Sequence, residues 1–570
     1  MRGVTASPGF DRTARLLRAA EKGGVPLNDR PAERIALVYP NRYAVGMASL
    51  GYQTVYRLFN EQPGIRCERV FIPPPPMERE IRALESGDPL KKFSVIGVSL
   101  ACETDLFRLV RLLSDAGIPP LASERSDAHP LLLIGGVLGG LNPSPLLPFA
   151  DAILAGEGEG VIPVISEALL SVRAGPGWKR GRLEALGGIP GIFRPRMDRF
   201  VERQAAHPLE QYPTYTPVCT PHSHFGDLFV VELTRGCGRG CLFCAGGKLY
   251  QPLRRHSPES VLDTVRRRNP GVRRVGLEGA SLSDYAGLEP LAESLVEEGH
   301  EVSFSSIRVD RITPQLVAVL EKSRVRSFTV APEAGTESLR GCIGKPLPDA
   351  VLTGAIRNLA DSPVETLKLY FLIGLPGETD EDATAVPALV RQAASLFLTS
   401  PRRRLRLSVN AFVPKPFTEF QWSSMADGRT LERRRSLIAS GLKGLRNVTF
   451  SEKSGREELI QGILATGGPE AGMAVHDKVM LGLSWKKALE RNGIDPERSL
   501  HAGRDPGAPL PWDFVRSGVS KSSLLERLRA RTSGPDAAGM DSAVRTEPDP
   551  APPGASSAPE PAASETPEVK

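Results

Sequence analysis

Residues 227–244 read DLFVVELTRGCGRGCLFC, and this stretch decides the fold of the second half of the chain. Its apolar first half is typical of a buried β-strand, and three cysteines follow within eight residues. Glycines between the cysteines let the backbone wrap closely around a bulky ligand. Three thiolates around a cubane iron–sulfur cluster leave one iron open for a small molecule, which is a catalytic arrangement. The sequence therefore predicts a metal centre held by Cys237, Cys241 and Cys244.

A series of further strands continues from this first strand, separated by amphipathic helical stretches. Six strand–helix units in about 200 residues fit a partial TIM barrel better than a full eightfold barrel. The alternative is a second open sheet. The barrel is expected over residues 226–450, with further strands at 273–278, 301–306, 326–331, 366–373 and 405–412.

The first half of the chain shows the same alternation of strands and helices. Short apolar runs at 35–39, 93–100, 131–134 and 152–154 predict a parallel α/β sheet. Residues 31–200 therefore form a doubly wound, flavodoxin-like domain. Ligands of such sheets bind outside the carboxyl ends of the strands, where Ser99, Gly135 and Gly136 lie.

The remaining segments differ in composition from the two α/β regions. Residues 1–30 form a polar lead-in without the apolar segment of a signal peptide, and residues 201–225 form a connector. Residues 451–531 have a helical pattern. Residues 532–570 are rich in Pro, Ala, Ser and Glu, so we expect a disordered tail.

The composition of the whole chain limits the class of protein. The 570 residues are 41% hydrophobic and 24% charged, which excludes a fibrous, wholly disordered or membrane-embedded protein. The net charge of +6 permits an anionic substrate without indicating a nucleic acid. Seven cysteines in so long a chain are not a disulfide framework. We expect a cytoplasmic protein with no membrane partner.

The CxxxCxxC segment resembles the signature of the radical S-adenosylmethionine (radical SAM) superfamily, and Phe243 matches its preference for an aromatic residue before the third cysteine. The resemblance implies that the three cysteines hold a 4Fe-4S cluster. It also implies that SAM chelates the open iron and is cleaved reductively to a 5′-deoxyadenosyl radical. An electron donor such as a flavodoxin or ferredoxin is then expected as a partner.

Later strand exits also resemble this superfamily. The resemblance implies that Glu278, in a Gly-Leu-Glu-Gly turn that departs from the usual Gly-Gly-Glu, binds the amino group of SAM. It implies that Arg308 pairs with the SAM carboxylate and that Glu333 binds the ribose. Backbone around Gly374 and Pro376 would approach the adenine. The alternatives remain a surface ion pair for the arginine, a helix cap for Glu333 and a simple turn for the glycine segment.

Residues 31–165 resemble the cobalamin-binding-type domain that precedes many radical SAM cores. In binding members, the Ser99 loop and the Gly135-Gly136 turn would accommodate the nucleotide tail. The usual Asp-x-His-x-x-Gly motif is absent, and no histidine occurs between Met1 and Ala128. Either cobalamin binds base-off without a protein imidazole, or the domain is a scaffold that shapes the substrate channel.

The resemblance implies radical methylation or rearrangement of an unknown substrate, which is a small molecule or an RNA. The order of motifs looks most like a functionally uncharacterised bacterial radical SAM family. One alternative is radical modification of tRNA, although Cys67 and Cys102 are too few for the second cluster of the tRNA methylthiotransferases. Another is a non-catalytic iron–sulfur or zinc sensor. A zinc site would need a fourth ligand from Cys219, His222, His224 or His256.

Overall fold

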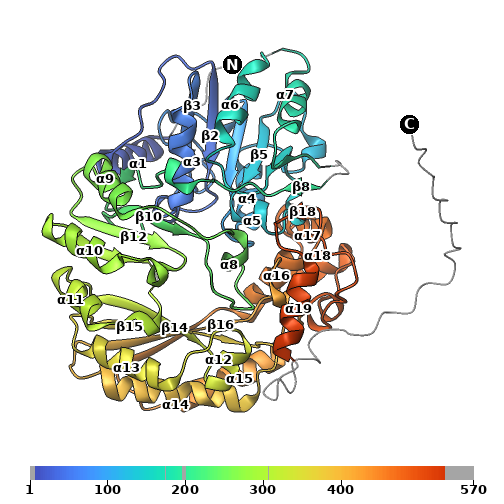
Figure 1. The fold of residues 1–570 in the computed structure, drawn as a ribbon. Coiled ribbons are helices and arrows are strands. Elements are labelled where there is room, and N and C mark those ends of the chain that lie inside the picture. The colour runs from blue at the N-terminus through green and yellow to red at the C-terminus, as the bar shows by residue number, and fades with distance from the viewer. Residues whose placement is uncertain (1–6, 174, 196–199, 306, 533–570) are drawn as a thin grey trace, which may run out of the picture.

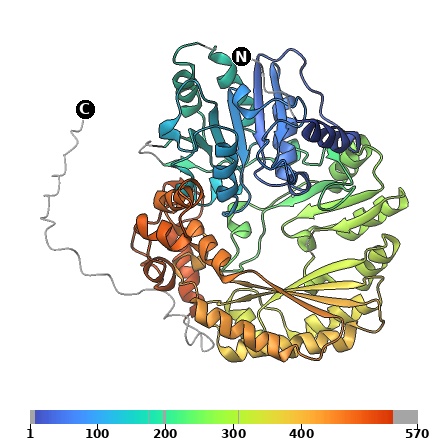
Figure 2. The ribbon, with the colours of Figure 1, turned by 180° about the vertical axis from the view of Figure 1, so that it is seen from behind.

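The computed structural model describes residues 7–173, 175–195, 200–305 and 307–532. An α/β region from the first half of the chain lies beside a second α/β region, and helices from the end of the chain lie between them (Figures 1 and 2). The predicted disordered tail lies, from residue 533 on, outside the described residues. Within the described ranges, no helix combines the length and apolar character needed to cross a bilayer.

The N-terminal sheet has the order β3-β2-β4-β5-β6-β7. Its first five strands are parallel and β7 is antiparallel. In chain order the parallel strands run 2-1-3-4-5, which is the flavodoxin-like arrangement, so the predicted fold class is confirmed. The strands are β2 (Glu33–Val38), β3 (Ile65–Val70), β4 (Val95–Ser99), β5 (Leu131–Gly135), β6 (Ala152–Leu154) and β7 (Ile192–Phe193).

Helices cover both faces of this sheet. One face packs against α3 (Leu50–Asn60), α6 (Ile162–Ser171) and α7 (Trp178–Gly187). The other face packs against α4 (Asp105–Asp115) and joins the hydrophobic core of the barrel. The sequence order reverses between β2 and β4, so the carboxyl ends of these two strands form the topological switch point at which such sheets bind ligands.

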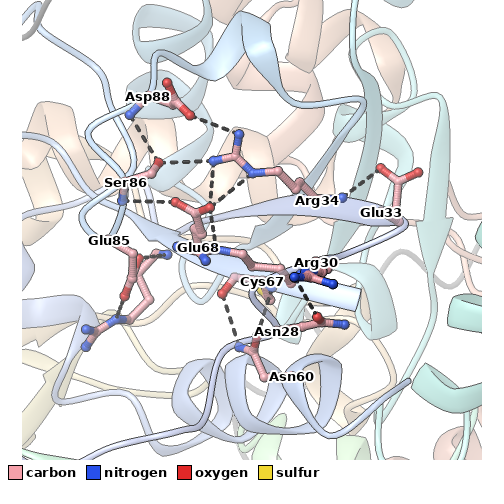
Figure 3. A network of polar contacts seen from close by, with 12 residues as sticks. Asn28, Arg30, Glu33, Arg34, Asn60, Cys67, Glu68, Glu85, Ser86 and Asp88 are labelled. Carbon is pink, nitrogen blue, oxygen red and sulfur yellow. Dashed lines mark hydrogen bonds and ion pairs between the residues drawn. The ribbon is translucent and has the colours of Figure 1, made fainter. Parts of the chain in front are cut away.

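The edge strand β3 is held by buried charges (Figure 3). Glu68 is fully buried and accepts hydrogen bonds from Arg34 at 2.6 Å and from Arg66 at 2.9 Å. Beside it, Asn60 of α3 exchanges hydrogen bonds with the backbone of Cys67. Burial raises the pKa of the Cys67 thiol well above its ordinary value, so this cysteine is a packing residue.

The second α/β region consists of two four-stranded sheets, ordered β11-β10-β12-β13 and β14-β15-β16-β17. All six predicted strands are present and parallel within their sheets. A seventh parallel strand, β17, was not predicted, and β11 pairs antiparallel with β10. The strands are β10 (Phe229–Arg235), β11 (Arg254–Arg255), β12 (Arg274–Gly279), β13 (Glu301–Phe304), β14 (Ser327–Glu333), β15 (Thr366–Ile373), β16 (Arg404–Ala411) and β17 (Val448–Glu452).

Helices lie on the outer side of these two sheets, as in a partial barrel (Figure 1). Between the described residues of β13 and β14 no pairing is recorded, so the barrel wall is divided there. The outer helices are α9 (Pro258–Arg268), α10 (Leu288–Glu297), α11 (Pro314–Lys322), α13 (Asp349–Ala360), α14 (Asp380–Phe397) and α15 (Gly428–Gly441).

The C-terminal region is mainly helical, as predicted, and joins the barrel to the N-terminal sheet (Figure 2). The Asn142 side chain, after β5, donates to the carbonyls of Ala465 at 3.1 Å and Gly467 at 2.8 Å. The Phe107 ring of α4 lies 6.3 Å from the Trp485 ring. The helices are α16 (Gly455–Thr466), α17 (Pro469–Met480), α18 (Trp485–Arg491) and α19 (Lys521–Thr532).

The polar lead-in contains structure that the sequence pattern did not reveal. Residues Pro8–Ala19 form helix α1, which buries Phe10. Strand β1 (Lys22–Gly23) pairs with β9 (Val218–Cys219) of the connector, and so ties the start of the chain to the segment before the barrel.

Candidate functional site

A cavity of about 580 Å³ lies between the carboxyl edge of the N-terminal sheet and the first two barrel strands. We call it the switch-point cavity. The predicted ligand-binding residues Ser99, Gly135 and Gly136 line it, and so does Glu278 of β12. The structure therefore brings candidates from both halves of the chain to one cavity. Further lining residues include segments 48–52, 97–101, 156–159 and 234–236, together with Glu232.

The N-terminal part of the cavity is an apolar slot between the sheet and helices α3 and α6. Gly97 lies in the middle of β4, where a Cβ atom would come within 3.2 Å of the Leu37 side chain. Gly136 has a φ of +90°, and a Cβ atom there would come within 2.5 Å of the Leu100 carbonyl. A side chain at Gly97 would fill part of the slot, whereas Gly136 is required by the close approach of its backbone to Leu100. This part of the cavity therefore fits an apolar part of a ligand.

The barrel end of the cavity is acidic. Glu232 and Glu278 are neighbours in the parallel register of β10 and β12. Arg235 donates to both carboxylate oxygens of Glu232, at 2.9 and 2.7 Å. Burial, together with the Glu232 charge, raises the pKa of Glu278 to about 7. The hydroxyl of Thr234, which is 2% exposed, has no hydrogen-bond partner among the described atoms. This end fits a ligand that carries a cationic or donor group.

The cysteine loop, residues 236–253, begins at this end of the cavity. Cys237, Cys241 and Cys244 are partly exposed, and the backbone N–H of Arg239 donates to the Cys237 sulfur at 3.4 Å. Burial, with smaller contributions from the other two thiols, raises the pKa of the Cys241 thiol to about 11. The three sulfurs are therefore within electrostatic reach of one another. Phe243 packs partly buried against the barrel core.

Among the described residues, no three His, Cys, Asp or Glu side chains stand close enough to hold a single metal ion. A cubane cluster binds each cysteine through a different iron, so its thiolates stand farther apart than the ligands of one ion. The donor set of three partly exposed thiols in one glycine-rich loop thus fits a cluster. It fits a single zinc ion less well, since none of the candidate fourth ligands Cys219, His222, His224 and His256 stands with two of these cysteines in a group that could hold one metal ion.

Later strand exits surround the cysteine loop. Arg239 donates to Asp284, after β12, at 2.9 Å. The backbone N–H of Leu242 donates to the Ile343 carbonyl, after β14, at 3.0 Å. Lys345 pairs with Glu333 at 2.8 Å, and its charge lowers the pKa of the Cys241 thiol, although burial outweighs this effect. Glu333 has a φ of +72°, a strained value for a residue with a side chain and typical of functional sites.

Five predicted ligand residues do not line the switch-point cavity, namely Phe243, Arg308, Glu333, Gly374 and Pro376. Arg308 donates to Asp310 at 2.9 Å. In the ligand-free protein it therefore forms the ion pair that the sequence offered as the alternative to binding SAM. Gly374 and Pro376 form a buried turn after β15, with a φ of +76° at Gly374. The backbone N–H of Gly374 donates to Glu378, whose pKa is raised to about 7 by burial.

Sequence reasoning missed a group of buried charges between the two halves of the chain. Glu157, after β6, accepts hydrogen bonds from Arg235 at 2.8 Å and from Arg254 at 2.7 Å. Glu159 pairs with the same Arg235 at 2.7 Å. The sequence alone offers no signal that the Gly-Glu-Gly-Glu segment at 156–159 pairs with these arginines, which lie 78 and 97 residues further along the chain.

Comparisons with known proteins agree with this architecture. The family model described as "Radical SAM proteins, N-terminal" matches residues 51–195, and the model of the "Radical SAM superfamily" matches residues 231–386. An uncharacterized protein of Methanocaldococcus jannaschii is 26% identical over 396 residues, which cover 68% of this chain and 79% of that protein.

Two more distant similarities concern proteins with described activities. A tRNA-2-methylthio-N(6)-dimethylallyladenosine synthase of Mycobacterium bovis is 22% identical over 51% of this chain, and the match spans only 61% of that relative. A solved structure of the radical S-adenosylmethionine methyltransferase TsrM from Kitasatospora setae, with cobalamin and a 4Fe-4S cluster bound, is similar at a TM-score of 0.45. It is 15% identical, and the match covers 66% of this chain and 72% of that one.

The cysteine loop at the end of the first barrel strand lies inside the matched superfamily region, and the flavodoxin-like sheet lies largely inside the matched N-terminal region. The chain belongs to the radical SAM superfamily of enzymes.

Proposed function

We propose that this chain holds one 4Fe-4S cluster through Cys237, Cys241 and Cys244 and uses it to cleave SAM. When bound, the cluster supplies the electron that breaks the sulfonium C–S bond and yields a 5′-deoxyadenosyl radical. The observation that carries the proposal is the loop of three thiols at the carboxyl end of β10, with one end at the switch-point cavity.

The residues around the loop are suited to bind the amino-acid part of SAM. Glu278, whose pKa is raised to about 7, gains a favourable partner when an ammonium group lies beside it. The charge of Lys345 acts on the Cys241 thiol and its side chain is 17% exposed, so it is a second candidate for the SAM carboxylate beside Arg308. In the ligand-free protein both cations are paired, Lys345 with Glu333 and Arg308 with Asp310, so either would exchange its partner for the ligand.

The proposed second ligand is cobalamin, bound base-off in the switch-point cavity. The apolar slot beside Gly97 would take the nucleotide tail, and the absence of a histidine before residue 129 leaves the cobalt without the usual lower ligand. The reaction proposed is methylation or rearrangement of a small-molecule substrate. An electron donor such as a flavodoxin or ferredoxin would reduce the cluster.

Radical modification of tRNA is the alternative, and the similarity to the mycobacterial synthase favours it. Against it stands the second cluster expected of tRNA methylthiotransferases. Cys67 is fully buried with a raised thiol pKa, and Cys102 is the other cysteine of that domain.

Anaerobic reconstitution tests the cluster. We expect about four irons per chain and release of 5′-deoxyadenosine when SAM and a reductant are added. Cys241→Ala should lose both, whereas the control Cys67→Ala should keep both. One bound zinc without SAM cleavage would contradict the proposal and support the sensor alternative.

Gly97→Leu tests cobalamin separately. The larger side chain collides with Leu37 and fills the slot, so we expect cobalamin binding to be lost while iron content and SAM cleavage remain. In the unaltered protein, the Co(II) electron paramagnetic resonance (EPR) spectrum should show no nitrogen splitting. Failure of the unaltered protein to bind cobalamin would reduce the N-terminal domain to a scaffold.

A further inference from the structure

The cysteine loop is closed at its base by two arginines. Arg235, the last residue of β10, lies opposite Arg254 of β11 in antiparallel register. The chain from 236 to 253 therefore leaves and returns at the same place. We call Arg235 and Arg254 the neck of the loop.

Glu157 of the N-terminal domain binds both sides of the neck. Its Oε2 atom accepts from Arg235 Nη1 at 2.8 Å and from Arg254 Nη1 at 2.8 Å, and its Oε1 atom accepts from Arg254 Nη2 at 2.7 Å. The backbone N–H of Ala206 donates to Oε2 at 2.8 Å. The side chains of Glu157, Arg235 and Arg254 are 8, 9 and 5% exposed, so water does not compete for these bonds.

Arg235 has two further carboxylate partners. Its Nη2 atom lies 2.7 Å from Glu159 and 2.7 Å from Glu232. Removal of Glu157 therefore leaves Arg235 paired, whereas Arg254 keeps only carbonyl acceptors among its recorded partners. Buried ion pairs contribute little to net stability, but breaking one leaves an uncompensated buried charge. A network of this kind acts mainly on the relative position of the elements that it joins.

The turn at residues 156–159, which carries Glu157 and Glu159, also faces the switch-point cavity. Residues 156–159 line the cavity, and Gly156 has a φ of +115° with no room for a Cβ atom against the Gln204 carbonyl. The turn therefore has one fixed path. Its glutamates reach the neck while its backbone borders the space in which a ligand would lie.

We propose that Glu157 is a positioning residue that fixes the neck of the cysteine loop against the wall of the switch-point cavity. The place of the three thiols then depends on the N-terminal domain, and a ligand in the cavity acts on the loop through the turn at 156–159. The proposal rests on the proposed function for the identity of the cluster. The order of the loop in the metal-free protein is independent of it.

Hydrogen–deuterium exchange of the metal-free full chain tests the clamp. In Glu157→Gln we expect amides within 236–253 to exchange about tenfold faster, because the neck can open at lower cost. The matched control is Glu33→Gln. Glu33 is the first residue of β2, at the edge of the sheet opposite the cavity, and its carboxylate is paired with buried Arg182. Its replacement should leave exchange in 236–253 unchanged. Arg254→Lys keeps the charge but loses the two-pronged contact, and should give an intermediate rate.

EPR of the reduced, reconstituted protein gives the second readout. We expect Glu157→Gln to retain the iron content but to show a shifted or broadened cluster signal, with Glu33→Gln unchanged. If Glu157→Gln does not fold, Arg254→Lys decides by the same two measurements. Exchange within twofold of the unaltered protein, an equal rise in Glu33→Gln, or an unchanged EPR signal would overturn the proposal. Failure of the unaltered chain to assemble a cluster would overturn the proposed function and leave the exchange test standing.

Discussion

Replacing Glu278 by glutamine should stabilise the ligand-free protein. Glu278 lies beside Glu232, and burial together with that charge raises its pKa from 4.5 to about 7. Such a carboxyl group ionises more readily in the unfolded chain than in the folded one. Its contribution to stability is therefore greatest below pH 4.5 and is lost as the pH rises towards 7.

The size of the effect follows from the shift in pKa. A shift of this size corresponds to about 3 kcal/mol of destabilisation at pH 8, and to less than about 1 kcal/mol at pH 5. Glutamine resembles the protonated carboxyl group and keeps an acceptor for Ser305. The Glu278→Gln variant should therefore be more stable than the unaltered protein by about these amounts at the two pH values.

Urea unfolding of the metal-free protein, followed by tryptophan fluorescence at pH 5 and pH 8, measures this difference. A stability gain that is equal at the two pH values would show that Glu278 does not titrate with a raised pKa. A loss of stability at pH 8 would show that the carboxylate already has a cationic partner. Either result would refute the reasoning that assigns this group to an ammonium-bearing ligand.

Two further substitutions test the strand exits. Gly136→Ala forces a side chain onto a φ of +90° and against the Leu100 carbonyl, so it should lower stability by about 1–3 kcal/mol, measurable as a lower melting temperature. Arg434→Met removes the cation from buried Glu378 and should cost about 3 kcal/mol at pH 8. Its cost should be smaller at pH 6, where Glu378, with a pKa of about 7, takes up a proton. An equal loss of stability for Arg434→Met at pH 6 and at pH 8 would contradict the expectation that Glu378 takes up a proton in this range.

Most strands of both α/β regions could be predicted because their apolar runs are bounded by clear breaks. Strand β3 could not, since its sequence IRCERV contains three charged residues. In the structure Glu68 is fully buried and Arg69 is 3% exposed, and both are paired. The pairing that makes this strand possible comes from Arg34 and Glu85, which local periodicity cannot identify. All five residues of strand β17, VTFSE, are at least partly exposed and three of them are polar, so this strand also lacks an apolar run.

The cysteine loop could be identified from spacing alone, because all three thiols and their glycines lie within one short stretch. The side chains around it could not. Arg308, matched to the SAM carboxylate from its place in the sequence, is paired with Asp310 in the ligand-free protein. Lys345 comes after a further helix, and only the fold shows that its charge acts on the Cys241 thiol. Sequence spacing does not encode such long-range contacts, so it could not identify Lys345 as a second cation near the loop.

The order of the two α/β regions along the chain has a physical consequence at the site. The carboxyl end of β10 borders the switch-point cavity through Thr234, Arg235 and Gly236, and the cysteine loop follows directly. Two ligands bound by different halves of the chain would therefore meet at one buried place. Two carboxylates there, Glu157 and Glu232, are already paired with Arg235. Glu278, whose pKa is raised, is therefore the carboxyl group left to respond to a ligand. A cationic ligand at this place would lower the pKa of Glu278 and so weaken the pH dependence expected of the ligand-free protein.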